Sequence, residues 1–403
     1  EINSYNGIYI SHIHPDHCSD ETLKKIDKSI PIYIHKYHAP FLKFKIETMG
    51  FNVIEIENGE TLKLSNNLQI KIFAADDCNP KLCYKFLGCA NFIEKKGSQQ
   101  IDSMAVISDK KHSILNINDC PFELSKEVVK KIKKKYKNID VLLTGYGGAG
   151  PYPQCIDNFS IEEKLIESKK KQENFLNQTI EYIKIIKPKY YLPFAGTYTL
   201  SGKLSNLQNL RGVPSIDDAY NFIDKKLKTY TELSNIKSIK INPESIFDVK
   251  KEKCEKDYKI FDHDNFKNYV LKNLVNRKLS YENDEEVEFN EIFELTKTAH
   301  KRYLKKINEL NINLDTDILL EVLGRYIIIP FNKGKLETVV KNKFTSKNKY
   351  VIYKLDVRLL KKILKGPKFA HWNNAEVGSH ISFFRKPNVY DRKLYFSMNY
   401  FHA

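Results

Sequence analysis

The sequence lacks the features that define several common classes of protein. Among its 403 residues the apolar runs are short, such as "YIIIPF" at 326–331, whereas a membrane helix needs about 20 consecutive apolar residues. Internal repeats and low-complexity tracts are also missing, which argues against a repeat architecture. We therefore expect a globular chain with no membrane partner, large enough to bury a substantial core.

Cysteine is scarce and does not occur in a cofactor-binding pattern. The seven cysteines are an odd number in a long chain, which suits a reducing cytoplasm better than a disulfide framework. The spacing of Cys78, Cys83 and Cys89 matches no common zinc or iron–sulfur pattern. A Rieske centre takes paired Cys and His ligands, and no cysteine has a histidine two residues later. The sequence predicts a cytoplasmic protein with no iron–sulfur cluster in this chain.

Acidic residues are outnumbered by basic ones. There are 66 lysines and arginines against 50 aspartates and glutamates, which gives a formal net charge of +16. A basic excess can indicate a nucleic acid, a membrane surface or an anionic substrate. The densest run, "KKIKKKYK" at 130–137, is typical of the solvated face of a helix. We therefore expect an anionic small molecule as the partner, such as a sugar acid or a nucleotide sugar, and not a nucleic acid.

Hydrophobic periodicity divides the chain into two regions. Up to about residue 200, apolar runs typical of strands alternate with amphipathic stretches, which predicts an α/β layered sheet with helices outside. Beyond that, a linker-like stretch near 235–260 and a polar helical segment lead into mixed strands and helices. We place an α/β domain at 1–235 and an α+β region at 236–403, packed over or beside the first. The expected helices of the first domain are 19–29, 39–50, 125–138 and 161–188, and a hairpin is expected around Asp109–Lys111.

The sequence does contain a dense group of metal-binding side chains. "YISHIHPDHCSD" at 9–20 places His12, His14, Asp16 and His17 directly after an apolar run. Neutral imidazole and carboxylate are ligands of borderline and hard divalent metals. Alternation at a strand end directs His12 and His14 toward one ion, and Asp16 and His17 then reach a second position. The pattern is the HxHxDH signature, and in this respect the chain resembles proteins of the metallo-β-lactamase fold.

This resemblance implies an αββα sandwich, of which the first hairpin, expected before residue 7, is missing. It also implies further metal-binding side chains. Asp119, after "SILNIN", resembles the aspartate that bridges two metals. A third histidine is expected near "FAADDCNP", where Asp76 offers a carboxylate instead, and a late histidine at "YYLPFAGTY", where Ala195 and Gly196 stand. The implied cofactor is one or two divalent ions, iron or zinc with manganese as a further option. An oxygen-rich pair suits iron or manganese better than zinc.

The order of the motifs narrows the resemblance. "IYISHIHPDH", "HSILNINDC", "VLLTGYGGAGPYP", "YLPFAGTY" and the tail "HWNNAEVGSHISFFRKPNVYDRKLYFSMNYF" are similar to CMP-N-acetylneuraminate hydroxylases, with a more distant likeness to the ascorbate-phosphate lactonase group. In the hydroxylase family a Rieske domain feeds electrons to a metal site that oxidises the N-acetyl methyl group of a CMP-linked sugar. The resemblance therefore implies a nucleotide-sugar substrate and a redox partner. Residues 205–345 match poorly.

Further residues are candidates for binding and catalysis. Glycines in a loop that follows a strand let a phosphate or a sugar approach the backbone closely. Lys203 and Arg211 can supply positive charge for a diphosphate, unless they are ordinary surface residues. As general acid or base we consider Asp16, Asp76 and His371, the last because the tail would fold over the metal cleft. The residues expected to contact the substrate are Gly147, Gly148, Gly150 and Tyr198.

Three functions are compatible with these residues. The first is iron-dependent hydroxylation of an N-acyl group on an anionic sugar or nucleotide sugar, with an external electron donor. The second is a hydrolase in which the same residues activate water on a lactone, a phosphodiester or an amide, with Asp16 or Asp76 as the base. The third is a non-catalytic metal-binding module. The intact HxHxDH quartet favours a metalloenzyme over the third.

Overall fold

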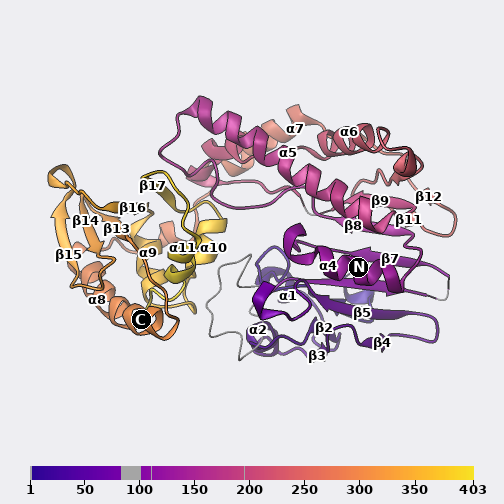
Figure 1. Cartoon of the computed structure of the whole chain (residues 1–403), viewed down its shortest axis with the longest axis horizontal. Coiled ribbons are helices and arrows are strands. Elements are labelled where there is room, and N and C mark those ends of the chain that lie inside the picture. Colours follow the sequence, from indigo (N-terminus) through magenta and orange to yellow (C-terminus); the bar gives the residue numbers. More distant parts are fainter. Residues whose placement is uncertain (1, 83–100, 110, 195) are drawn as a thin grey trace.

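The computed structural model describes residues 2–82, 101–109, 111–194 and 196–403. The N-terminal part contains two main sheets with helices on their outer sides and a two-stranded hairpin, and the C-terminal part contains a five-stranded sheet with its own helices (Figure 1). In Figure 1 the C-terminal sheet, coloured orange to yellow, lies to the left of the two N-terminal sheets. None of the helices in the described ranges combines the length and the apolar character that crossing a bilayer requires.

The first sheet consists of three parallel strands in the order β1-β2-β3. Ser19 begins its first helix, and the Ser19 side chain accepts a hydrogen bond from the backbone N–H of Thr22, as is typical of an N-cap residue. Leu42 and Ile46 of the second helix are buried in the core of this layer. The elements are β1 (Ile8–Tyr9), α1 (Asp20–Leu23), β2 (Ile32–His35), α2 (Phe41–Glu47) and β3 (Val53–Ile56).

The second sheet has seven strands in the order β10-β9-β8-β7-β6-β5-β4. Neighbouring strands are antiparallel from β4 to β7 and parallel from β7 to β10. The strands are β4 (Thr61–Lys63), β5 (Gln69–Ala74), β6 (Ser103–Ser108), β7 (Ser113–Asn116), β8 (Val141–Thr144), β9 (Tyr190–Pro193) and β10 (Lys237–Ser238). The helices that pack on this sheet are α4 (Phe122–Lys135), α5 (Ile161–Ile186) and α6 (Ile216–Leu227).

The inner faces of the two sheets pack against each other. Tyr9 and Tyr33 of the first sheet share a hydrophobic cluster with Ile70 and Ile72 of the second. Burial of a side chain as large as Ile72, which is fully buried, contributes about 2 kcal/mol. The predicted sandwich of two sheets between helices is therefore confirmed. Because β7, β8 and β9 are parallel, the loops that follow them lie at one edge of the sandwich.

The stretch predicted to be a linker at 235–260 belongs to the N-terminal sandwich instead. Strand β10 pairs with β9, and the hairpin of β11 (Phe247–Asp248) and β12 (Lys253–Cys254) places Phe247 in a cluster with Val141 and Tyr190. The linker prediction is wrong because the polar composition of this segment conceals very short strands. The domain division at residue 235 stays a prediction, and these contacts favour a boundary nearer Tyr281, where the C-terminal core begins.

The C-terminal part has a five-stranded mixed sheet in the order β15-β14-β13-β16-β17. Ile156, in the loop after β8, forms a parallel bridge with Phe383 of β17, so the two parts of the chain are in direct contact. The strands are β13 (Thr316–Val322), β14 (Arg325–Ile329), β15 (Glu337–Val340), β16 (Lys349–Lys354) and β17 (Ser382–Lys386). The helices of this part are α8 (Phe289–Glu309), α9 (Val357–Leu364), α10 (Trp372–Val377) and α11 (Arg392–Met398), and α7 (His263–Tyr269) precedes them in the chain and contributes no residue to the C-terminal core.

One carboxyl group in the C-terminal core predicts a pH dependence of stability. Glu376 of α10 faces Arg385 of β17 and the phenol groups of Tyr353, Tyr390 and Tyr395. Burial raises the pKa of Glu376 from 4.5 to about 7, although Arg385 opposes this shift. Below pH 4.5 both the folded and the unfolded chain hold the proton. Between about pH 4.5 and 7 the unfolded chain ionises while the folded chain keeps its proton, so we expect stability to fall by up to about 3 kcal/mol across this range and no further above it.

Urea unfolding at several pH values between about 4.5 and 8 measures this loss. We expect Glu376→Gln to remove this part of the pH dependence, because glutamine does not ionise. Glu286, which is solvent-exposed, provides the matched control, and Glu286→Gln should behave like the wild type. The same pH dependence in all three proteins would contradict a proton held by Glu376 in the folded state.

Candidate metal centre

The HxHxDH residues lie together where β1 ends, on a backbone that is held at several points. The backbone N–H of His17 donates to the carbonyl oxygen of His14 at 3.0 Å, which folds the motif into a tight turn. The carbonyl oxygen of Ser11 accepts hydrogen bonds from the hydroxyl groups of Ser103, at 2.7 Å, and of Tyr37. Ser103 belongs to the second sheet, so the two sheets together fix the position of the turn.

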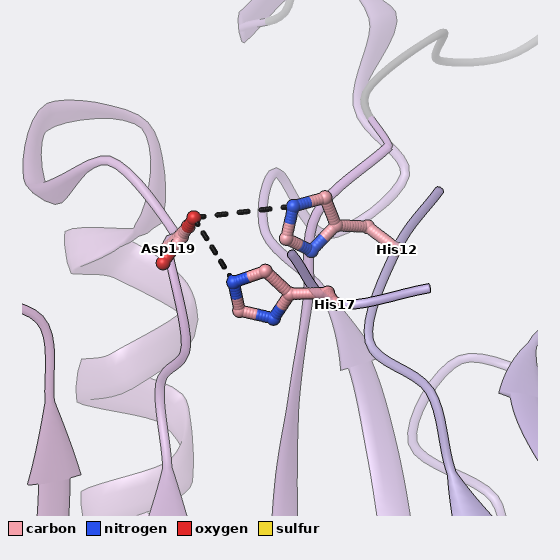
Figure 2. A group of neighbouring side chains, drawn as sticks. All are labelled: His12, His17 and Asp119. Atoms are coloured by element: carbon pink, nitrogen blue, oxygen red, sulfur yellow. Dashed lines mark ion pairs between the residues drawn. The ribbon is translucent and has the colours of Figure 1, made fainter. Parts of the chain in front are cut away.

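Two imidazoles and a carboxylate form one candidate metal-binding group, drawn in Figure 2. Oδ2 of Asp119 lies 3.3 Å from Nε2 of His17 and 3.9 Å from Nε2 of His12. The Asp16 carboxylate lies 3.7 Å from Nε2 of His17 and is largely exposed, so it borders the group on the solvent side. The structure thus brings Asp119, which follows β7, to the histidines, as the sequence predicts. Its role as a ligand stays a prediction.

A second group shares His12 with the first. Nε2 of His12 lies 3.0 Å from Nδ1 of His14 and 3.7 Å from Oδ1 of Asp102, and the three residues offer ligand atoms that all lie within 4.8 Å of one another. The sequence analysis missed Asp102, which directly precedes β6. A carboxylate at the start of the largely buried strand "SMAVIS" is the signal that could have found it.

The hydroxyl group of Ser11 orients two of the imidazoles. Its Oγ lies 3.0 Å from Nδ1 of His12 and 3.1 Å from Nδ1 of His17. A hydroxyl oxygen can accept two hydrogen bonds, so both Nδ1 atoms can donate to it, and both Nε2 atoms then face Asp119, where a metal ion would replace the proton on His17. Metal-binding histidines are commonly oriented in this way by a partner on the other ring nitrogen. Sequence reasoning did not consider Ser11.

The protonation states at this site suit a cation. Burial lowers the pKa of His12 to about 3, and the nearby His17 and His14 act in the same direction. Burial alone would raise the pKa of Asp119, but the hydrogen bond with His17 and the charges of His17, His12 and His14 together outweigh burial and lower the pKa, so this carboxylate is ionised. Burial lowers the pKa of His17, but its hydrogen bond with Asp119 and the charges of Asp119 and Asp16 outweigh burial and raise it, so a metal ion would displace a proton from this imidazole. Neutral imidazole and ionised carboxylate are the forms that bind metal ions. The residues of both groups therefore fit a divalent metal.

Two of the predicted site residues have structural roles. Asp76 is fully buried outside both groups, and its Oδ1 accepts a hydrogen bond from the backbone N–H of Cys78 at 3.0 Å in the turn after β5. Asp102 holds the position beside His12 and His14 that the sequence assigned to Asp76. His371 begins α10, where its Nδ1 accepts from the backbone N–H of Asn373 at 3.2 Å. Metal-binding or catalytic roles for Asp76 and His371 stay predictions.

Asn373, which the sequence analysis also missed, connects the C-terminal part to the metal centre. Its Nδ2 lies 3.2 Å from Nε2 of His14, across 359 positions of sequence. The opposite ring nitrogen, Nδ1 of His14, faces His12. Asn373 is therefore placed to fix the orientation of a candidate ligand, and no local sequence signal could have revealed it.

The packing of Gly196 explains why a late histidine is missing at that position. A Cβ atom on Gly196 would lie 2.4 Å from ring atoms of Tyr146, so any larger side chain would require Tyr146 to move. Ala195, the other residue at the expected place, lies outside the described residues, as do Cys83 and Cys89.

Close packing also explains why glycines occur in the loop after β8. A Cβ atom would lie 2.2 Å from the carbonyl oxygen of Gly196 if added to Gly147, and 2.4 Å from the ring of Phe175 if added to Gly148. Gly150, with φ of +140°, faces open space instead. Close packing thus accounts for two of the three glycines, and substrate contacts of all three stay predictions.

Comparison with known proteins identifies relatives but no family model, since none matches this chain. The chain is 26% identical over 201 residues to the cytidine monophosphate-N-acetylneuraminic acid hydroxylase of Danio rerio, a match covering 48% of this chain and 29% of that protein. It is 27% identical over 203 residues to the inactive cytidine monophosphate-N-acetylneuraminic acid hydroxylase of Homo sapiens, covering 48% and 35%. The match thus spans about a third of the length of these curated relatives.

Solved structures with some similarity include two proteins of about 13% identity. One is the diiron β-hydroxylase CmlA from Streptomyces venezuelae, with a TM-score of 0.36 over 57% of this chain and 43% of that chain. The other is the metallo-β-lactamase fold protein YhfI from Bacillus subtilis, with a TM-score of 0.31 over 59% and 76%.

The class of this protein follows from its own features together with the sequence relatives. It has an HxHxDH motif at a strand end and two sheets packed between helices, and this is a metallo-β-lactamase fold. Within that class, 48% of the chain is similar in sequence to the CMP-N-acetylneuraminic acid hydroxylases of Danio rerio and Homo sapiens.

Proposed function

We propose that this chain is a metal-dependent enzyme that hydroxylates an N-acyl group of an anionic, nucleotide-linked sugar. The observation that carries the proposal is the pair of metal-binding groups that share His12, within a chain whose relatives are CMP-N-acetylneuraminic acid hydroxylases. The similarity covers a fraction of those proteins, so the substrate class comes from the printed names of the relatives.

The donor set supports a redox-active metal. Three imidazoles and the carboxylates of Asp102 and Asp119 make a site richer in oxygen than a zinc site built mainly of histidine, and such a set suits iron or manganese. A redox-active ion at these residues supplies the electron-transfer chemistry that breaking a C–H bond requires. In the balanced reaction a methyl C–H becomes C–OH and the second atom of O₂ leaves as water. Two electrons come from an external donor, such as a Rieske protein, and two protons come from solvent.

The chain's own residues have separate tasks in this proposal. His12, His14, Asp102, His17 and Asp119 hold the metal. Asp16, whose side chain is 67% exposed, lies beside the site where it can pass protons between solvent and the reaction. Asn373 positions His14 from the C-terminal part.

Two measurements test the proposal. Elemental analysis of protein purified without added metal should find iron at one or two equivalents. Incubation of that protein with CMP-N-acetylneuraminate, O₂ and a chemical reductant should give a product heavier by one oxygen atom in mass spectrometry, and ¹⁸O₂ should label it. Zinc together with hydrolysis of the substrate would overturn the oxygenase in favour of a hydrolase. Protein that binds metal but converts no substrate would favour the non-catalytic metal-binding module, and protein that binds no metal would overturn the metal centre.

A further inference from the structure

Two cationic side chains lie together at the edge of the sandwich without an acidic partner among the described residues. Lys171 projects from α5, and Arg211 follows a 3₁₀ helix, Gly202–Leu210. Nζ of Lys171 donates to the carbonyl oxygens of Tyr152, at 2.9 Å, and of Arg211, at 3.1 Å. Nε of Arg211 donates to the carbonyl oxygen of Gln208 at 2.7 Å. Carbonyl oxygens accept these hydrogen bonds, but they do not neutralise the two charges.

Both cations are partly withdrawn from solvent. Burial lowers the pKa of Lys171 to about 8, and the charge of Arg211 acts in the same direction, while Cys155 opposes it. Burial also lowers the pKa of Arg211, and its Nη1 is buried without a hydrogen-bond partner in the described part of the chain. A buried charge and an unpaired buried donor both destabilise a fold. An anion bound between the two side chains would offset both effects.

Two uncharged polar side chains, Tyr198 and Gln154, extend the cluster formed by Lys171 and Arg211. The guanidinium of Arg211 lies 5.1 Å from the centre of the Tyr198 ring. The Tyr198 hydroxyl lies 3.3 Å from Nε2 of Gln154, which also contacts Ser379 Oγ at 3.0 Å. Gln154 is 1% exposed, and its Oε1 has no partner among the described residues. A buried amide with a free acceptor beside two unpaired cations indicates a site for a ligand with both anionic and hydroxyl groups.

Strand direction places this cluster at the same edge as the metal centre. Asp119 lies just beyond β7, Gln154 lies in the loop after β8, and Tyr198 lies in the loop after β9. These three strands are parallel, and ligands of such sheets bind at the carboxyl ends of the strands. Lys203, the other cation considered from the sequence, is already paired with Asp356 at 2.7 Å.

We propose that Lys171, Arg211, Tyr198 and Gln154 bind a phosphate group of the organic substrate beside the metal centre. The planar guanidinium suits the paired oxygens of a phosphate, and the ammonium of Lys171 adds a second charge. This inference rests on the proposed function and adds to it the residues that recognise the anionic part of the substrate.

The test uses the full, metal-loaded chain and inorganic phosphate as the probe. Phosphate should raise the melting temperature relative to chloride at equal ionic strength, and Arg211→Gln or Lys171→Met should weaken phosphate affinity at least about tenfold. Lys171→Met should also raise the melting temperature without phosphate, because it removes an uncompensated charge. Lys170→Gln is the matched control, since Lys170 is an exposed neighbour paired with Glu167.

The outcomes separate this site from the metal centre. If His12→Ala, which removes a member of both metal-binding groups, abolishes the phosphate effect while Arg211→Gln retains it, phosphate binds the metal and the proposed site is wrong. If Lys171→Met lowers the melting temperature with and without phosphate alike, the side chain is structural and the proposal fails. Metal content measured on the same samples distinguishes a failure of the phosphate-site proposal from a failure of the proposed function. A protein that holds metal but gains nothing from phosphate overturns this inference alone, and a protein without metal overturns the proposed function.

Discussion

Replacing His12 with alanine should lower the metal affinity of this protein at least about a hundredfold. Loss of a group that only orients a ligand typically costs ten- to hundredfold, and His12 contributes Nε2 to both candidate groups. His14→Ala removes a member of one group only, so it should retain one ion where the wild type holds two. Titration with a chromophoric chelator measures both affinities, and elemental analysis counts the ions.

His112 provides a control for the loss of an imidazole. It lies in the hairpin turn between β6 and β7, where its ring is 3.4 Å from the Asp109 carboxylate, and His112→Ala should leave the metal content unchanged. Because His12 is completely buried, its removal could affect folding, so circular dichroism of the His12→Ala protein is needed to establish that it is folded. Normal metal content in a folded His12→Ala protein would show that the metal centre lies elsewhere.

Asn373→Ala should reduce metal affinity by about ten- to hundredfold although Asn373 is not itself a ligand. The oxygen and nitrogen of a carboxamide can exchange places with little change in shape. With its Oδ1 turned toward His14, Asn373 accepts the Nε2–H hydrogen bond. The Nδ1 lone pair of His14 then faces His12 at 3.0 Å, ready to bind metal.

The conservative variant separates positioning from packing. Asn373→Asp keeps an acceptor for the Nε2–H of His14 and should retain most of the metal affinity. Asn374→Ala, an exposed position on the same helix, should have no effect. Nitrogen NMR of the metal-free protein reports the tautomer of His14 directly. An unchanged proportion of Nε2–H in Asn373→Ala would show that Asn373 does not select it.

Much of the fold and half of the candidate site could be predicted from local pattern. The long helix expected at 161–188 is α5, Ile161–Ile186, because Ser160 and Glu163 form a capping box at its start and Pro188 follows its end. The hairpin around Asp109–Lys111 is present as β6 and β7. The prediction of a linker near 235–260 was wrong because strands of two residues are too short to show a periodicity.

Other parts of the site could not be predicted because their residues carry at most a weak signal where they stand. Asp102 is an ordinary acidic residue until β6 places it beside His12, and Ser11 is an ordinary serine until two imidazoles turn toward its hydroxyl. The substrate-binding role of Gly147 stays a prediction, and the structure adds a packing reason for this glycine, because a Cβ atom there would meet the backbone of Gly196.

The sequence by itself determined that an imidazole-rich turn follows a strand, because six consecutive positions fix which side chains share a turn. The tertiary structure decided which carboxylates and amides complete that turn, and which cations lack partners. Its decisive contacts join positions as distant as His14 and Asn373. Such pairs meet only through the packing of whole sheets and helices, which no local spacing records.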